Sequence, residues 1–167
     1  MNAIYTRRSV RQYRDKQVEQ SLIEQLLKAA MQAPSAMNQQ CWEFLVVKNR
    51  DALNELVNYN VGAKMLKDAP LAIIVLGNMN RVVSQSSWQC DLGAVTQNIL
   101  LEATTLGLGA VWLGTINNSD REKFISKQFN LSDNLIPYSV ISIGYPKNDN
   151  ANYFLDRYDE SRITYID

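Results

Sequence analysis

The chain has 167 residues, of which 46% are hydrophobic, and its 17 Lys and Arg residues balance 17 Asp and Glu residues. This length and composition predict one folded domain and exclude a disordered chain, and the zero net charge gives no overall attraction to nucleic acid or an anionic membrane. The chain has no histidine, which excludes Ser-His-Asp and Cys-His hydrolysis and removes the commonest ligand of catalytic zinc.

The first half of the chain predicts two helical regions and two strands. Apolar residues recur at three- and four-residue spacing from Leu22 to Met31, which predicts an amphipathic helix that ends near Pro34. The elements that follow are a strand over 42–48, short helices after Arg50 and at Met65, and a strand over 71–78. Because the run 71–78 is apolar throughout, we expect this strand to be covered on both faces and central in the sheet.

The second half begins with a long helix over 88–106, whose apolar positions lie almost all round its surface. Such a helix is expected in the middle of the fold. A strand over 109–116 follows, then a helix with Ser119 as its N-cap that runs to about Phe129, and a strand over 136–144. Helices alternating with strands indicate a mixed α and β class with one sheet between helical layers, in a strand order that the pattern leaves open.

The segment 150–167 is polar but carries aromatic residues at intervals. It has too little apolar content to fold alone and too many aromatic rings to be a solvated end. We therefore predict one domain over 1–167, in which this C-terminal tail docks on another surface, either that of its own domain or that of a second copy.

Compartment and membrane contact are constrained by a few features. Two cysteines, Cys41 and Cys90, are too few for a disulfide framework and lack metal-binding spacing, so we predict a reducing, cytoplasmic location. The start of the sequence has no apolar signal segment, and the longest apolar tract, 99–116, is interrupted by polar residues and glycines. No membrane or nucleic-acid partner is therefore expected.

Arginines are concentrated at the N-terminus, where Arg7, Arg8, Arg11 and Arg14 surround Ser9. Guanidinium groups bind phosphate through two parallel hydrogen bonds, and a serine hydroxyl adds a further donor. The cluster is therefore a candidate phosphate site. The alternative is a solvated basic helix face, because three of these arginines also have helical spacing.

Two further segments are candidate sites. The loop Ala33 to Gln40 offers Ser35, Asn38 and Gln40, whose side chains could bind the edge of a heterocycle, although such loops are commonly simple turns. Gly109 and Gly114 do not form a phosphate loop, because Thr115 stands where that motif requires Lys, and GxGxxG is also absent. Gly114 could still expose backbone amides to a ligand, or simply end a strand.

Taken together, these segments resemble the nitroreductase-like FMN-dependent oxidoreductases over nearly the whole chain. The matching motifs are RRSVRQYRDKQV, APSAMNQQCWEFLVV, DLGAVTQNILLEATTLGLGAVWLG, and IGYP with the later RYDESRITY. The resemblance implies an α+β fold with a central, mainly antiparallel sheet between helices, in an intertwined homodimer whose C-terminal tail docks on the partner subunit.

The resemblance also implies a function. The implied protein is an NAD(P)H oxidoreductase with FMN bound at the subunit interface. Hydride would pass from NADH or NADPH through FMN to a nitroaromatic, quinone or related small-molecule acceptor in a ping-pong cycle. The flavin carries the chemistry, so no catalytic side chain is expected. Alternatives are a protein that senses or stores flavin, and a phosphate-ligand binding domain.

By the same resemblance, Arg7, Arg8 and Ser9 hold the FMN phosphate together with Arg157, and Arg11 lies near the ribityl chain or the pyrimidine edge. The residues expected along the isoalloxazine ring are Pro34, Ser35 and Ala36, with Asn38 and Gln40 from the facing subunit and the backbone of Leu113 and Gly114. The residues considered as possible pocket lining are Tyr59, Met65, Met79, Val82, Val83 and Trp88, for which ordinary packing is the alternative.

Overall fold

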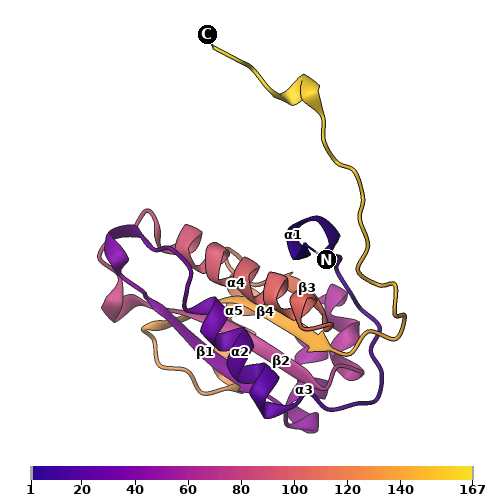
Figure 1. The fold of residues 1–167 in the computed structure, drawn as a ribbon. Helices are drawn as coiled ribbons and strands as arrows, with labels where there is room; N and C mark the ends of the chain where they lie inside the picture. The colour runs from indigo at the N-terminus through magenta and orange to yellow at the C-terminus, as the bar shows by residue number, and fades with distance from the viewer. Residues whose placement is uncertain (1, 167) are drawn as a thin grey trace.

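The computed structural model describes residues 2–166 and contains a four-stranded antiparallel sheet with helices on both faces (Figure 1). The strands are β1 (Trp42–Val47), β2 (Leu71–Asn78), β3 (Gly109–Gly114) and β4 (Leu135–Gly144). They are arranged in the order β1-β2-β4-β3, and every pair is antiparallel. The predicted α+β class is therefore confirmed.

Strand β2 is central and apolar on both faces, as its unbroken apolar run predicts. Successive side chains of a strand point to opposite faces. Ile73 and Val75 therefore belong to the core on one side of the sheet, and Ile74 and Leu76 to the core on the other. This strand joins the two hydrophobic layers of the domain.

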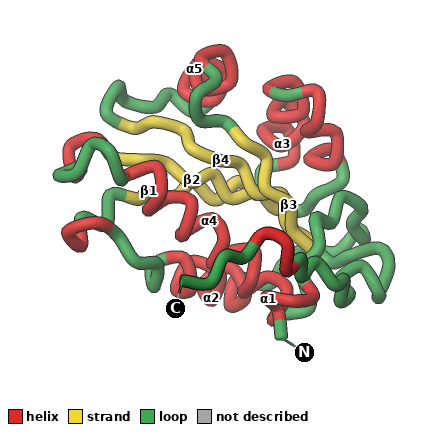
Figure 2. Tube along the Cα trace, turned by 90° about the horizontal axis from the view of Figure 1, so that it is seen from above, coloured by secondary structure: helices red, strands yellow, loops and turns green. Residues whose placement is uncertain are grey.

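Each face of the sheet has its own helical layer (Figure 2). One layer contains α2 (Gln20–Ala30) and α4 (Trp88–Thr105). The other contains α3 (Arg50–Leu56), α5 (Ser119–Gln128) and the 3-10 helices Val57–Tyr59 and Val61–Lys67. The helix expected to reach Pro34 ends at Ala30, and the N-cap of α5 is Asn118, whose side chain accepts from the Arg121 amide, instead of the expected Ser119.

Helix α4 is buried on one side only, which corrects the expectation of burial all round. Leu92, Val95 and Ile99 are fully buried against the sheet and α2. By contrast, Cys90 is exposed, and Ala94, Gln97 and Leu101 are only partly buried. In a single chain, α4 therefore presents a partly apolar face to solvent.

The arginine-rich N-terminal segment is extended, so the alternative of a basic helix face is wrong. After the short helix α1 (Ala3–Thr6), Ser9 forms a parallel bridge with Ala110 of β3, and the Val10 amide donates to the Ala110 carbonyl over 3.0 Å. Pairing with a sheet edge outweighs the helical spacing of the arginines. Val10 and Tyr13 point inward and are buried, and Arg11 is exposed.

Gly109 allows this pairing, because a Cβ atom there would lie 2.6 Å from Cγ1 of Val10. We expect Gly109→Ala to lower the free energy of unfolding by about 1–3 kcal/mol, the usual cost of overpacking. Chemical denaturation measures the loss. Combining Gly109→Ala with Val10→Ala should cost less than the sum of the two single changes, and strict additivity would contradict this contact.

Residues 153–166 of the C-terminal tail extend away from the domain (Figure 1). Only Glu160–Arg162 forms a helical turn there. The exposed large apolar residues of the tail are Tyr153, Phe154, Leu155, Tyr158, Ile163, Tyr165 and Ile166. In one chain, the expected docking of the tail on its own domain therefore does not occur beyond contacts near α1.

Candidate functional site

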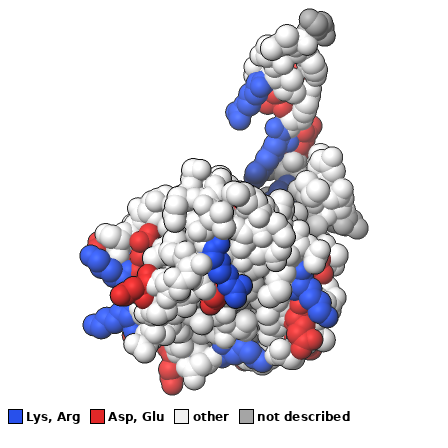
Figure 3. All heavy atoms as spheres, turned by 90° about the vertical axis from the view of Figure 1, so that its left-hand side faces the viewer, with Lys and Arg blue, Asp and Glu red and all other residues white. Residues whose placement is uncertain are grey.

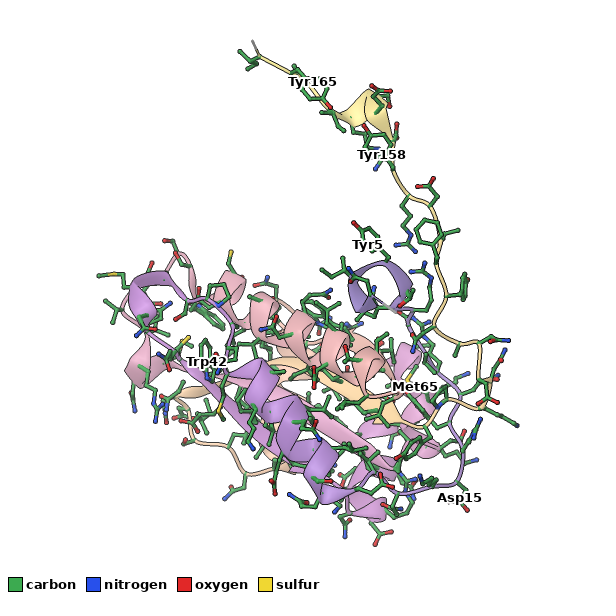
Figure 4. All side chains as sticks on the ribbon, in the orientation of Figure 1. Tyr5, Asp15, Trp42, Met65, Tyr158 and Tyr165 are labelled. Atoms are coloured by element: carbon green, nitrogen blue, oxygen red, sulfur yellow. The ribbon has the colours of Figure 1, made fainter. Side chains whose placement is uncertain are left out.

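Three of the predicted phosphate ligands come together between α1 and the start of the tail. Arg7, Arg8 and Arg157 line a cleft of about 400 Å³. Partial burial lowers the pKa of Arg7, and the positive charges of Arg8 and Arg157 lower it further. Tyr5, in α1, and Tyr158, on the tail, line the same cleft and are labelled in Figure 4. The structure thus joins arginines that are 150 positions apart in the sequence.

The three positive charges have no carboxylate partner within residues 2–166. Asp156 lines the cleft, but its carboxylate accepts from the Tyr158 amide over 3.0 Å. Elsewhere on the surface, basic and acidic side chains are interspersed, as one face in Figure 3 shows. Neighbouring guanidiniums without a counter-charge favour a bound anion.

Arg8 also has a local structural role. Its guanidinium donates to the carbonyl of Arg7 over 2.6 Å and to that of Tyr5 over 3.3 Å, and it lies 4.8 Å from the centre of the Tyr153 ring. Its Nε atom is buried without a hydrogen-bond partner. Arg8 therefore connects α1 to the tail and keeps one donor unused.

The remaining N-terminal candidates separate into two groups. Ser9 and Arg11 line a smaller cleft of about 210 Å³ beside the arginine cluster. Arg14 lies apart, because its Nε donates to the Pro146 carbonyl over 2.9 Å and its guanidinium pairs with Asp149. Arg14 therefore does not belong to the cluster.

The loop after α2 holds its polar residues in an unusual backbone conformation. Met37, Asn38 and Gln40 have φ values of 53°, 53° and 43°. The Ser35 hydroxyl accepts from the Gln40 amide over 3.2 Å, and the Gln40 side chain donates to Asn38 Oδ1 over 2.7 Å. Left-handed backbone at non-glycine residues is costly and clusters at functional sites.

A buried pair, missed in the sequence, supports this loop. Asp91 of α4 accepts from the Ala36 amide over 3.0 Å and from Gln39 Nε2 over 2.5 Å. Gln39 Oε1 in turn accepts from the amides of Val83 and Ser84, over 2.8 and 2.9 Å. An aspartate directly before the apolar Leu92 in a helix expected to be buried was the available signal, since a buried carboxylate requires partners.

The end of β3 contributes the last predicted residues. Leu113 is buried, whereas Gly114 is exposed and has open space where a Cβ atom would stand. Arg121, which sequence reasoning also missed, donates to the Gly114 carbonyl over 2.9 Å and to Asn60 Oδ1 over 3.3 Å. Arg121 therefore fixes this strand end to the segment after α3.

Among the possible pocket residues, Tyr59, Met65 and Trp88 are buried in the core, which favours ordinary packing. Burial raises the pKa of Tyr59 to about 12. Val83 is exposed and lies on the loop that contacts Gln39.

One chain does not bring all the predicted residues together (Figure 1). The loop 34–40 is bonded to Asp91 at the start of α4. Arg8 is connected through Asn152 to the Leu108 carbonyl, just beyond the end of α4 at Thr105. The helical rise between Asp91 and Thr105 separates these places by about 21 Å.

Two other classes of site find no support in the described part of the chain. Across residues 2–166, no helix combines the length and apolarity needed to cross a bilayer. The same residues contain no group of three or more Cys, Asp or Glu side chains placed to hold a metal ion.

Comparison with known proteins gives a consistent result. The nitroreductase family model matches residues 4–63 and 55–145. A protein of Methanothermobacter thermautotrophicus, with the provisional name NADH dehydrogenase/NAD(P)H nitroreductase, is 41% identical over 98% of this chain and 84% of its own. A crystal structure from Clostridium acetobutylicum, provisionally named NADH oxidase, has a TM-score of 0.94 and 47% identity over 97% of each chain.

A structure with a bound flavin is also similar. It comes from Desulfovibrio desulfuricans and is provisionally named a nitroreductase in complex with FMN. Its TM-score is 0.84 and its identity 26%, over 99% of this chain and 94% of that one.

Proposed function

Because the chain belongs to the nitroreductase family, we propose that it is an FMN-dependent NAD(P)H oxidoreductase that acts as a homodimer. It uses NADH or NADPH to reduce a nitroaromatic, quinone or related small molecule in a ping-pong cycle. The observation that carries this proposal is the cluster of Arg7, Arg8 and Arg157, which has no carboxylate partner within residues 2–166. A reducing, cytoplasmic location is part of the same proposal.

The cluster suits the phosphate of FMN. A phosphate ester carries about 1.5 to 2 negative charges near pH 7. Arg7 and Arg157 offer guanidiniums to it, Arg8 offers its unused Nε, and Ser9 adds a hydroxyl beside the cleft. These donors replace the water that the phosphate loses on binding.

The ring-contacting residues come from two copies of the chain in this proposal. Arg11, Leu113 and Gly114 belong to the copy that holds the phosphate, and the exposed Gly114 leaves room for a flat ring to approach the backbone. Pro34, Ser35, Ala36, Asn38 and Gln40 belong to the facing copy, because their loop lies at the other end of α4.

When bound, FMN would supply the redox chemistry, which is hydride transfer from the nicotinamide and onward to the acceptor. The protein side chains bind and orient the ring and the substrates, and none is required as an acid or base. The half-exposed face of α4 is available to cover the flavin from a second copy.

The tail is proposed to dock on that second copy. Within residues 2–166, the outer edge of β1 pairs with no other strand. Beside that edge is a cleft of about 520 Å³ that contains Leu27, Met31 and Phe44. Burial of the tail's aromatic residues would remove a large apolar surface from water.

Flavin absorbance and reduction test the proposal. We expect the purified protein to be yellow, or to become yellow with FMN, and to bleach anaerobically on addition of NADH or NADPH. A protein that takes up no FMN would contradict FMN dependence and favour another phosphate ligand. Bound FMN that neither nicotinamide reduces would favour the alternative of flavin sensing or storage. Turnover with nitroarenes and quinones then identifies the acceptor class.

A further inference from the structure

A continuous chain of buried and partly buried hydrogen bonds joins the proposed ring-contacting loop to the segment Val83–Ser84 and to α4. It runs from the Val83 and Ser84 amides through the Gln39 side chain to the Asp91 carboxylate, which also accepts from the Ala36 amide. Gln39 is 9% exposed and Asp91 6%. Neither side chain is among the proposed FMN ligands.

We propose that Gln39 and Asp91 are positioning residues, which hold Asn38 and Gln40 in the conformation that contacts the flavin bound by the partner subunit. This inference rests on the proposed function. Asn38 and Gln40 flank Gln39 directly, are exposed, and have φ values of 53° and 43°. Such a backbone conformation persists only where the surrounding structure fixes it. The hydrogen bonds of the Gln39 side chain fix it here.

The hydrogen bonds have a fixed polarity. Gln39 Oε1 faces two backbone donors, so Gln39 Nε2 must face the carboxylate of Asp91. In Asp91→Asn, turning the new amide oxygen toward Gln39 directs the new NH₂ group at the Ala36 amide, and the opposite rotamer directs it at Gln39 Nε2. In Gln39→Glu, two carboxylates face each other. Each single change therefore leaves a donor–donor or like-charge contact in a buried place.

The double variant Gln39→Glu/Asp91→Asn restores the polarity. One oxygen of the introduced glutamate would accept from Val83 and Ser84, and its other oxygen would accept from the NH₂ group of the introduced asparagine. The amide oxygen of that asparagine would accept from Ala36. The double variant also keeps the charge of the pair unchanged, so it is a matched control for each single variant.

The test is FMN affinity, measured by flavin fluorescence on the wild-type protein, both single variants and the double variant. We expect each single change to weaken FMN binding about tenfold or more, and the double variant to recover to within about threefold of wild type. Ile99→Val, a change in the α4 core away from the loop, controls for general destabilisation and should leave affinity unchanged. Equal affinity in all five proteins would overturn the positioning role, whereas absence of FMN binding in wild type would overturn the proposed function.

Subunit mixing tests whether the pair acts across the interface. Asp91→Asn damages the loop, and Arg7→Ala/Arg8→Ala damages the phosphate site. When both variants are unfolded and refolded together, a mixed dimer should have one site with both defects and one intact site, so roughly one quarter of all sites should bind FMN with wild-type affinity. Ion-exchange chromatography separates the mixed dimer from the two parent dimers by charge, and the FMN titration of the mixture measures this fraction. Formation of mixed dimers with no recovered sites would show that the pair acts within its own subunit and would overturn the inference.

Discussion

Replacing Arg7 and Arg8 together with alanine is expected to weaken FMN binding about 100-fold or more while the chain stays folded. Hydrogen bonds to charged groups contribute about 1.5–3 kcal/mol each, so losing two of them predicts a decrease of this size. Their contribution to folding should be smaller, because the cluster places like charges together. Flavin fluorescence titration measures the affinity, and circular dichroism reports on the fold.

Matched arginines provide the controls. Arg14→Ala removes an arginine that pairs with Asp149, and Arg162→Ala removes one that pairs with Asp159. Both lie outside the cluster and should leave FMN affinity within about threefold of wild type. Unchanged affinity in the Arg7→Ala/Arg8→Ala variant would contradict the phosphate assignment.

The two roles of Arg8 can be separated. Because its guanidinium donates to carbonyls of Arg7 and Tyr5, its removal also loosens α1. Arg7→Ala/Arg157→Ala leaves these bonds in place and removes two charges from the same cleft. This second pair should lose affinity to a similar degree, which would exclude local unfolding of α1 as the cause.

Much of the sheet and of the two helical layers could be predicted, because local patterns fix them. The unbroken apolar run of β2 and the three- and four-residue spacing in α2 each determine one element and its buried face. The N-terminal segment could not be predicted in this way. Its helical spacing is a local signal, whereas its extended shape depends on pairing with Ala110, about 100 positions away.

The kinds of residue in the candidate site could be predicted from the sequence, but their arrangement in space could not. Concentrated arginines indicate an anion site, and the structure places Arg157 beside Arg7 and Arg8. The Gln39–Asp91 pair joins positions 52 apart, and no periodicity encodes such a contact. The incomplete burial of α4 has a similar origin, because the apolar pattern of a helix does not say which of its apolar positions the rest of the domain covers.

Removal of the C-terminal tail is expected to weaken dimerisation strongly. A chain that ends at Asn152 should dimerise with an affinity lower by about 100-fold or more. The reason is that burying even two aromatic or aliphatic side chains of the tail contributes about 1.5–3 kcal/mol each. Asn152 is retained because it bonds the Arg8 amide and the Leu108 carbonyl. Sedimentation over a range of concentrations measures the dimer. The truncated chain should also lose FMN, since Arg157 is removed with the tail.

Two variants distinguish these consequences. Arg157→Ala should weaken FMN binding and leave the dimer intact, because the apolar residues of the tail remain. Ile163→Ser/Tyr165→Ser keeps Arg157 and should weaken the dimer, because it removes two exposed apolar side chains of the tail that lie outside the arginine-lined cleft. If both variants and the truncated chain dimerise like wild type, the tail does not hold the subunits together. The interface would then be confined to surfaces such as the half-exposed face of α4.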